Sequence, residues 1–544
     1  MKKNKKHLKT FPSTIVFAAT GIFFILIAGI HAQQPPPTQS TSNSNIKIIE
    51  LKHADMLYKR KNFDAQILKD NVILYHEGAF MYCDSAYWYE RENIFEAFSN
   101  VRMEQGDTIF VYGNYLHYDG NRRLARLREN VRMENPQATL FTDSLNYDRL
   151  ENISYYFDGG MLVDEENELT SIWGQYSPDS KEALFKENVK LINPDFTLYT
   201  ETLKYNTETK IADIMGPSVL VSDSGYIYTT RGWYNTETDD CQLLDRSQVI
   251  NKDSTQILIG DTIYYNRKNG IAEVYGNMFL QDTIKKVILK GNYGYYNEKT
   301  EFALATDSAH AIEYSQKDSL YIHADTLKMI TDSLGREMQA YPNARFYRVD
   351  LQGVCDTMHY VSNDSTIYMR NDPVIWNEDN QVMGDRIDVL LNDSTIEKAY
   401  VRNYAFSIQK RPVEDQYNQL KGRNMTVSFL DGEMRHVLVD GSAESLYYLM
   451  EKDSTIIGIN KTESPFLSMD IADNKLEKLK LWSSIKGVTT PLSQTSPEDK
   501  TLKGFVWLDY LRPINKDDIF RKVKRKDSEN IIPPRRFVRE EEFD

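Results

Sequence analysis

The chain has little cysteine and no excess of positive charge. Three cysteines in 544 residues cannot build a disulfide framework or a four-thiolate metal site. The 65 basic side chains are outnumbered by 79 acidic ones, which gives a net charge of −14. A nucleic-acid-binding protein needs a basic face to neutralise phosphates, so we expect no nucleic-acid partner. With 41% hydrophobic and 12% aromatic residues, the chain is nevertheless not a disordered acidic protein.

Familiar catalytic motifs are also missing from the sequence. It contains no nucleophile elbow of the Gly-x-Ser-x-Gly type, no His-Glu-x-x-His and no phosphate-binding loop. His117 and His359 occupy one position of the repeat described below, where we expect separate surface residues and not a metal pair. Cys83 and Cys355 share another repeat position and lie too far apart along the chain to form a disulfide. We therefore predict that the protein is not an enzyme and uses no cofactor or metal.

Long hydrophobic runs are confined to the N-terminus. Residues 15–30 form an apolar run that follows five lysines and precedes Ala32, which is the pattern of a signal peptide. The run is shorter than the roughly 20 residues of a membrane span. We predict a signal peptide over residues 1–32, with an uncleaved anchor as the alternative, and a disordered linker over 33–46. The body of the protein is then expected in the periplasm, soluble or associated with the inner or outer membrane.

A period of about thirty residues runs through the rest of the chain. Its first marker is an Asn-Val pair at Asn71, Asn100, Asn130 and Asn188, with steps of 29, 30 and 58 residues. Its second marker is an acid or amide, followed two positions later by an apolar residue and usually four positions later by an aromatic one. Examples are Asn114/Leu116/Tyr118, Asp143/Leu145/Tyr147, Glu201/Leu203/Tyr205 and Asp261/Ile263/Tyr265. Two markers in one phase indicate a repeat protein.

The spacing within the second marker is that of a β-strand, because side chains two apart share one face. We predict an all-β fold, an elongated twisted β-jelly roll or solenoid of about thirteen two-strand repeats over residues 47–482. Each repeat is expected to add one strand to each of two facing sheets. Residues 483–544 are expected to form a C-terminal linker and a basic tail, either solvated or bound to anionic lipid. Open strand edges at the ends could pair with another chain.

The repeat resembles that of the OstA-like family, which includes the lipopolysaccharide-transport proteins LptA and the N-terminal domain of LptD. The resemblance rests on an Ala-Asp-x-x-x-Tyr unit, a turn and an apolar strand that ends in Asn-Val, clearest over residues 53–103. It spans about residues 47–480. It implies a β-jelly roll whose apolar groove shields the acyl chains of lipopolysaccharide or a related glycolipid. It also implies edge-strand contacts with other bridge proteins, with the outer-membrane translocon as a further candidate partner.

The residues expected to line such a groove are the inward-facing members of the repeat. They are Leu116, Tyr118, Leu127, Val131, Leu145, Tyr147, Phe185, Val189, Leu203, Tyr205, Ile263, Tyr265, Val274 and Met278. Two alternatives remain open from the sequence. One is an envelope scaffold whose interior is filled by its own side chains, and the other is a secreted β-helix enzyme that acts on polysaccharide.

Overall fold

The structure is a computed structural model that describes residues 47–526 except 316, 333–334, 393–395, 414, 431–432, 452–454 and 473–474. The predicted signal peptide, the linker over 33–46 and most of the basic tail lie outside the described residues. Within them the fold is all-β, as predicted, with 42 strands and four short 3-10 helices.

The strands follow one another along the chain as a meander. The first group is β1 (Glu50–His53), β2 (Met56–Lys59), β3 (Gln66–His76), β4 (Ala79–Tyr89), β5 (Ile94–Gln105), β6 (Ile109–Asp119), β7 (Leu124–Glu134), β8 (Thr139–Asp148), β9 (Ile153–Tyr156), β10 (Gly160–Val163), β11 (Glu168–Ser171) and β12 (Trp173–Ser177). The second is β13 (Glu182–Asn193), β14 (Phe196–Asn206), β15 (Ile211–Ile214), β16 (Ser218–Ser222), β17 (Gly225–Thr229), β18 (Arg231–Asn235), β19 (Asp240–Leu244), β20 (Ser247–Asn251), β21 (Gln256–Gly260), β22 (Thr262–Asn266), β23 (Ile271–Asp282) and β24 (Val287–Asn297). The third is β25 (Phe302–Thr306), β26 (His310–Glu313), β27 (Leu320–His323), β28 (Thr326–Asp332), β29 (Gly335–Tyr341), β30 (Ala344–Arg348), β31 (Leu351–Cys355), β32 (Thr357–Val361), β33 (Thr366–Arg370), β34 (Val374–Asn377), β35 (Asn380–Met383) and β36 (Arg386–Leu391). The last is β37 (Ile396–Lys410), β38 (Tyr417–Leu430), β39 (Glu433–Met450), β40 (Ile456–Ala472), β41 (Lys475–Trp482) and β42 (Lys486–Pro491), followed by η1 (Leu492–Gln494), η2 (Pro497–Lys500), η3 (Asp509–Leu511) and η4 (Asp518–Phe520).

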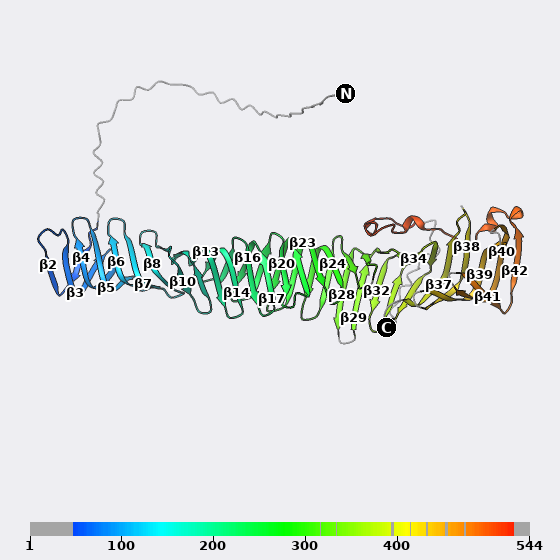
Figure 1. The fold of residues 1–544 in the computed structure, drawn as a ribbon, viewed down its shortest axis with the longest axis horizontal. Helices are drawn as coiled ribbons and strands as arrows, with labels where there is room; N and C mark the ends of the chain where they lie inside the picture. The colour runs from blue at the N-terminus through cyan, green and yellow to red at the C-terminus, as the bar shows by residue number, and fades with distance from the viewer. Residues whose placement is uncertain are drawn as a thin grey trace, which may run out of the picture. The chain divides into compact units, whose positions relative to one another are not determined.

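A long strand such as β4 crosses the whole width of the fold and bends at its middle. The first half of β4 pairs with the second halves of β3 and β5, and the second half of β4 pairs with their first halves. The register of the pairing with β5 shifts between Tyr82 and Ser85. Strands such as β9 and β10 make the same crossing as two separate segments. One continuous antiparallel sheet is thus folded along its middle into two facing halves. We call the half that contains β2, β22 and β41 sheet 1, and the half that contains β1, β21 and β42 sheet 2. Figure 1 shows β2 at one end of the folded body and β41 and β42 at the other.

The two markers of the repeat meet at this bend. Asn100 and its predecessor Ser99 have positive φ angles of 51° and 63°, a left-handed conformation that asparagine tolerates better than most residues. Nδ2 of Asn100 donates a hydrogen bond to Oδ2 of Asp84 at 2.7 Å, so the Asn-Val marker of one strand binds the acidic marker of the preceding one. The same pairing joins Asn71 to Asp55 and Asn277 to Asp261. The markers are therefore structural.

Two expectations about the repeat need correction. Each thirty-residue period contains two full crossings, as β4 and β5 illustrate, so it adds two strands to each sheet and not one. This doubles the rise per repeat to about 9.6 Å. The sheet also continues past Trp482, because β42 pairs with β40 within the segment expected to be a linker.

The C-terminal segment, residues 492–526, packs on the outward face of sheet 2. We call it the strap. Leu508, which is fully buried, joins Trp376 and Phe406 in a second hydrophobic core separate from the one between the sheets. Gln381 fixes the strap by accepting a hydrogen bond from the Leu508 amide at 2.8 Å and donating one to the Val506 carbonyl oxygen at 2.8 Å. The apolar residues around Trp507 are thus part of the fold.

Candidate functional site: the interior between the sheets

The interior between the sheets is where the sequence places the lipid. All fourteen predicted lining residues belong to the hydrophobic core between the sheets, and thirteen of them are buried. Tyr265 is partly buried against the same core. Leu116, Leu145 and Leu203 have no exposed surface. Before residue 249 the interior is filled by its own side chains, and we call this region the filled part. Contact of any of the fourteen residues with a lipid stays a prediction.

Each sheet has a margin away from the bend, where the turns between strands lie, and we call this margin its rim. In the filled part the two rims are joined by buried polar groups. The hydroxyl of Tyr205 on sheet 1 donates a hydrogen bond to Oδ2 of Asp164, at the rim of sheet 2, over 2.6 Å. Nζ of Lys210 lies 3.1 Å from the same oxygen, and the Asp164 side chain is completely buried. Nδ2 of Asn167 donates to Oδ1 of Asp164 at 3.0 Å. Burial and the bond to Asp164 raise the pKa of Tyr205, so it stays a hydrogen-bond donor at physiological pH.

A second rim cluster surrounds Tyr118. Nδ1 of His76, from sheet 2, lies 2.7 Å from the Tyr118 hydroxyl of sheet 1. Nη1 of Arg149 donates to the same hydroxyl at 2.6 Å, and its Nη2 donates to the Glu77 carbonyl oxygen at 3.1 Å. Arg123 forms an ion pair with the Glu77 carboxylate. Burial lowers the pKa of His76, so the imidazole is neutral at pH 7. Links of this kind hold the two rims together.

Farther along the chain the interior is less completely covered. Inward positions there are often alanines, including Ala303, Ala305, Ala311 and Ala340. Around them, larger apolar side chains pack on the core but remain partly exposed. They include Val249, Tyr265, Leu280, Tyr296, Leu320, Ile322, Met329, Leu351, Met358, Ile367, Ile375, Val382, Leu391 and Ile396. We call residues 249–399 the half-open stretch. Small side chains in inward positions leave their neighbours without full cover, which explains the difference.

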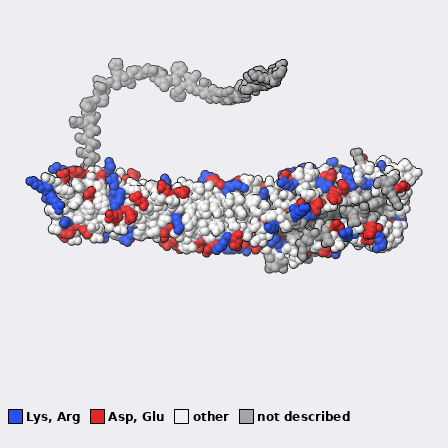
Figure 2. Space-filling view, viewed as in Figure 1, with Lys and Arg blue, Asp and Glu red and all other residues white. Residues whose placement is uncertain are grey.

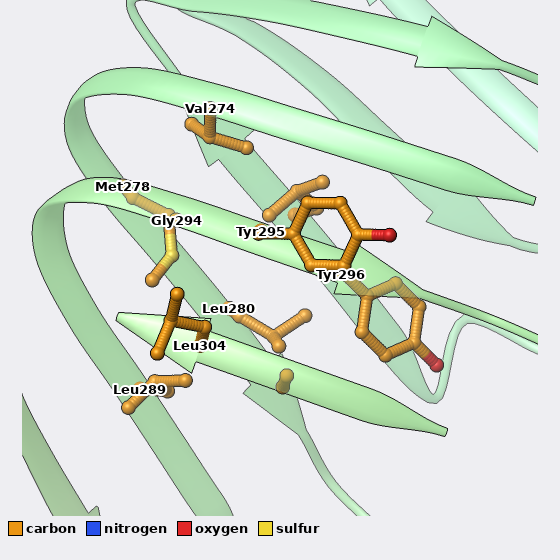
Figure 3. Close-up of a pocket in the computed structure, with 10 residues that line it drawn as sticks. Val274, Met278, Leu280, Leu289, Gly294, Tyr295, Tyr296 and Leu304 are labelled. Carbon is orange, nitrogen blue, oxygen red and sulfur yellow. The ribbon is translucent and has the colours of Figure 1, made fainter. Parts of the chain in front are cut away.

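A cavity marks the beginning of this stretch (Figure 3). Met278, Leu280 and Leu289 lie next to one another there, and Leu280 is paired with Leu289 across strands β23 and β24. Gly294 borders the cavity, and a Cβ at this position would lie 2.7 Å from Sδ of Met278. The cavity volume is about 10 Å³, which is the space of a single water molecule. No acyl chain fits there while the side chains keep this arrangement.

The reactive residues considered from the sequence lie apart from any catalytic arrangement. Cys83, Cys241 and Cys355 are free and buried, and burial raises the pKa of each thiol to about 12, so all three are unreactive thiols. His117 and His359 lie in β6 and β32, far apart along the sheet. Among the described residues, no group of three or more His, Cys, Asp or Glu side chains could hold a metal ion. Within the same residues, no helix has the length and apolar character needed to cross a bilayer.

Comparison with known families supports the resemblance inferred from the repeats. Residues 46–201 match the family described as OstA-like protein. Over this segment the chain is similar to the OstA-like family. The match covers most of the filled part of the chain, and the half-open stretch lies beyond it. The repeats that carry the resemblance continue to about residue 480. No curated protein matches the chain significantly.

The sequence identified which face of each strand points inward but did not identify the half-open stretch. Ten of the fourteen predicted lining residues precede residue 249, in the filled part. A signal was present, because alanine replaces larger residues at inward positions such as Ala305, Ala311 and Ala340. The rim links were not predicted either. Tyr205 and Asp164 are 41 residues apart, and nothing in the local pattern pairs them.

Proposed function

We propose that this chain is a periplasmic protein of the outer-membrane assembly pathway that binds and transports lipopolysaccharide or a related glycolipid. The OstA-like segment supports a role connected with lipopolysaccharide transport. The observation that carries the proposal is the half-open stretch, where inward apolar side chains such as Ile322 and Met358 keep part of their surface exposed. An acyl chain that covers such surface gains about 0.8 kcal/mol for each methylene removed from water.

Binding in this stretch requires the two sheets to move apart at their rims. The cavity at Met278 has the volume of one water molecule, so room for acyl chains must come from such a separation. The filled part has rim links that oppose separation, including the ion pairs of Asp164 and Glu77. The sugar and phosphate headgroup would stay at the wet rim. The protein would take no catalytic part, and direction would come from a partner that uses energy.

The partners follow from the ends of the folded sheet. At one end β1 and β2 pair only with β3, and at the other β41 and β42 pair only with β40 within the described residues. A strand with one free edge can accept a strand from another protein. We therefore propose edge-strand contacts with other β-jelly-roll proteins of a transport bridge, and with the outer-membrane translocon, after export from the cytoplasm by the N-terminal signal.

A second function is favoured by the filled interior before residue 249. Leu116, Tyr147 and Leu203 are completely buried and leave no room for a ligand between the sheets. A chain that behaved this way throughout would be an envelope scaffold that acts through its edges and surfaces and carries no lipid.

The two functions are separated by photo-cross-linking in the cells that produce the protein. Met358, inward in the half-open stretch, would be replaced by p-benzoylphenylalanine, and the adducts analysed for lipopolysaccharide. Tyr368 is the control, because it lies on the neighbouring strand β33 directly before Met369, the buried partner of Met358, and therefore points to the opposite, outward face of the sheet. Leu203 is a second position, inside the filled part.

We expect a glycolipid adduct at Met358 and none at Tyr368 or Leu203. Absence of any lipid adduct at Met358, with the variant folded and exported, would favour the scaffold. Equal adducts at Met358 and Leu203 would contradict the distinction between the filled and half-open parts.

A further inference from the structure

The outward face of sheet 2 is apolar over the strands β16 to β26. Along these strands, outward positions alternate with core positions such as Leu220 and Leu258. The outward set includes Val219, Tyr228, Ile257, Ile259, Phe279 and Ile288, all at least partly exposed. Lys290 is the charged residue among the outward positions of these described strands, and its Nζ lies 5.5 Å from the ring centre of Phe279. A large exposed apolar face of this kind usually marks a contact surface.

This face continues directly into the surface that the strap covers. The ring of Phe520, from η4 of the strap, lies 5.0 Å from that of His310 in β26 and 4.7 Å from that of His323 in β27. The strap therefore reaches β26, and the apolar face extends from there toward β16. Figure 2 shows that the middle of the body carries few charged side chains on the side in view.

The covered part shows what kind of ligand this face accepts. Its outward glutamines bind the backbone of an extended chain: Gln419 accepts from the Leu502 amide at 2.8 Å and donates to the Lys500 carbonyl oxygen at 2.9 Å. Gln381 does the same for residues 506 and 508. The strand register places Gln281, in β23, in the same outward row as Gln381. The uncovered part thus repeats the combination of apolar and amide side chains.

We propose that the outward face of sheet 2 from β16 to β26 is a docking site for an extended, apolar polypeptide segment of a partner protein. The segment lies across the strands, in line with the strap, and places its apolar side chains on Tyr228, Ile257 and Ile288. An anionic membrane fits this face poorly, because the face offers one lysine and the chain carries a net charge of −14. The inference does not depend on lipid transport, since it concerns the opposite face of the sheet.

The test is site-specific cross-linking of the full chain in the cells that produce it. Tyr228 would be replaced by p-benzoylphenylalanine, and the cross-linked peptides identified by mass spectrometry. Tyr264 is a matched control, because it is 43% exposed against 41% for Tyr228 and lies on the outward face of sheet 1. The Tyr228 probe would also be tested with Ile257→Lys and Ile288→Lys. Far-ultraviolet circular dichroism would verify that each variant folds.

The expected result is an adduct at Tyr228 that maps to one apolar segment of another protein. It should be absent at Tyr264 and at least tenfold weaker with the two lysine substitutions. An adduct with residues 527–544 of the same chain, with a second copy, or with lipid alone would overturn the proposal. So would the lack of any protein adduct at Tyr228, equal adducts at both tyrosines, or an adduct that the lysine substitutions leave unchanged.

Discussion

Removal of the Lys210 ammonium tests whether the rim links hold the two sheets together. In Lys210→Met, the Asp164 carboxylate keeps its hydrogen bonds from Tyr205 and Asn167 but loses its ion-pair partner while completely buried. Removing one partner of a buried ion pair costs about 3–5 kcal/mol. Because four hydrogen bonds to the Asp164 carboxylate remain, from Tyr205, from the Glu166 amide and from the amide and side chain of Asn167, we expect a loss of about 3 kcal/mol.

Hydrogen exchange measures this loss locally. Local unfolding of the β10–β11 hairpin, whose turn contains Asp164 and Asn167, exposes its amides to solvent. A loss of about 3 kcal/mol raises their exchange rates by about 150-fold if this opening limits exchange. The matched control is Lys204→Met, since Lys204 and its partner Glu182 have side chains that are 39% and 43% exposed. An exposed pair contributes less than about 1 kcal/mol, so exchange should rise less than about fivefold.

A double variant separates the ion pair from general damage. Asp164→Asn combined with Lys210→Met removes the stranded charge, so it should recover most of the protection that Lys210→Met loses. If Lys210→Met changes exchange no more than Lys204→Met does, the rim links do not close the interior and the reasoning fails.

Four further predictions concern the bend, the strap and the core. Asn100→Ala should lower the free energy of unfolding by about 1–2 kcal/mol, because it removes the bond to Asp84 and places alanine at positive φ, whereas Asn100→Gly should cost less; chemical denaturation compares them. Gln381→Leu should release the strap, because two buried backbone groups at Val506 and Leu508 lose their partners at about 1–3 kcal/mol each, and the fluorescence of the neighbouring Trp507 should shift to the red. Burial lowers the pKa of His310 and His323 below 6.5, so these two histidines bind more protons when the strap is released than when it is docked. The stability of the docked strap is therefore complete above about pH 6.5 and falls as the pH drops toward the folded pKa. Limited proteolysis after Arg521 should detect this loss. Leu203→Ala should cost about 2–5 kcal/mol because the side chain is completely buried, and an unchanged unfolding midpoint would argue against a filled core.

The repeat, the strand type and the inward phase could be predicted because they are local properties. Leu203 and Tyr205 share a face by strand geometry alone, and both are buried as expected. The role of the two markers could not be predicted, because it depends on a contact between strands. Asn100 and Asp84 are 16 residues apart, and their hydrogen bond exists because the bend brings one strand against the preceding one. A sequence period shows that such positions are equivalent without showing which of them touch.

The strap could not be predicted for the same reason at longer range. Leu508 contacts Gln381 from 127 residues away, and Arg345 donates to the Leu511 carbonyl oxygen across 166 residues. Residues 505–508 are all apolar in the sequence, but an apolar patch can be buried against any uncovered face. The position of the strap is set by the outward face of sheet 2. The residues of this face alternate with core residues along each strand, so in the sequence they look like an ordinary exposed strand face.

One position of the repeat accounts for much of the difference between the filled and half-open parts. The aromatic residue four after the acidic marker is completely buried at Tyr118, Tyr147 and Tyr205, and it is only partly buried at Tyr265 and Tyr296. In the filled part this tyrosine spans the interior, and at Tyr118 and Tyr205 its hydroxyl binds the opposite rim. Where neighbouring inward positions become glycine and alanine, as at Gly294 and its cross-strand partner Ala305, the same side chain has less to pack against. A single repeat design can thus give a rigid closed segment and an adjustable one by changing side-chain volume at a few inward positions, without any change in the backbone meander.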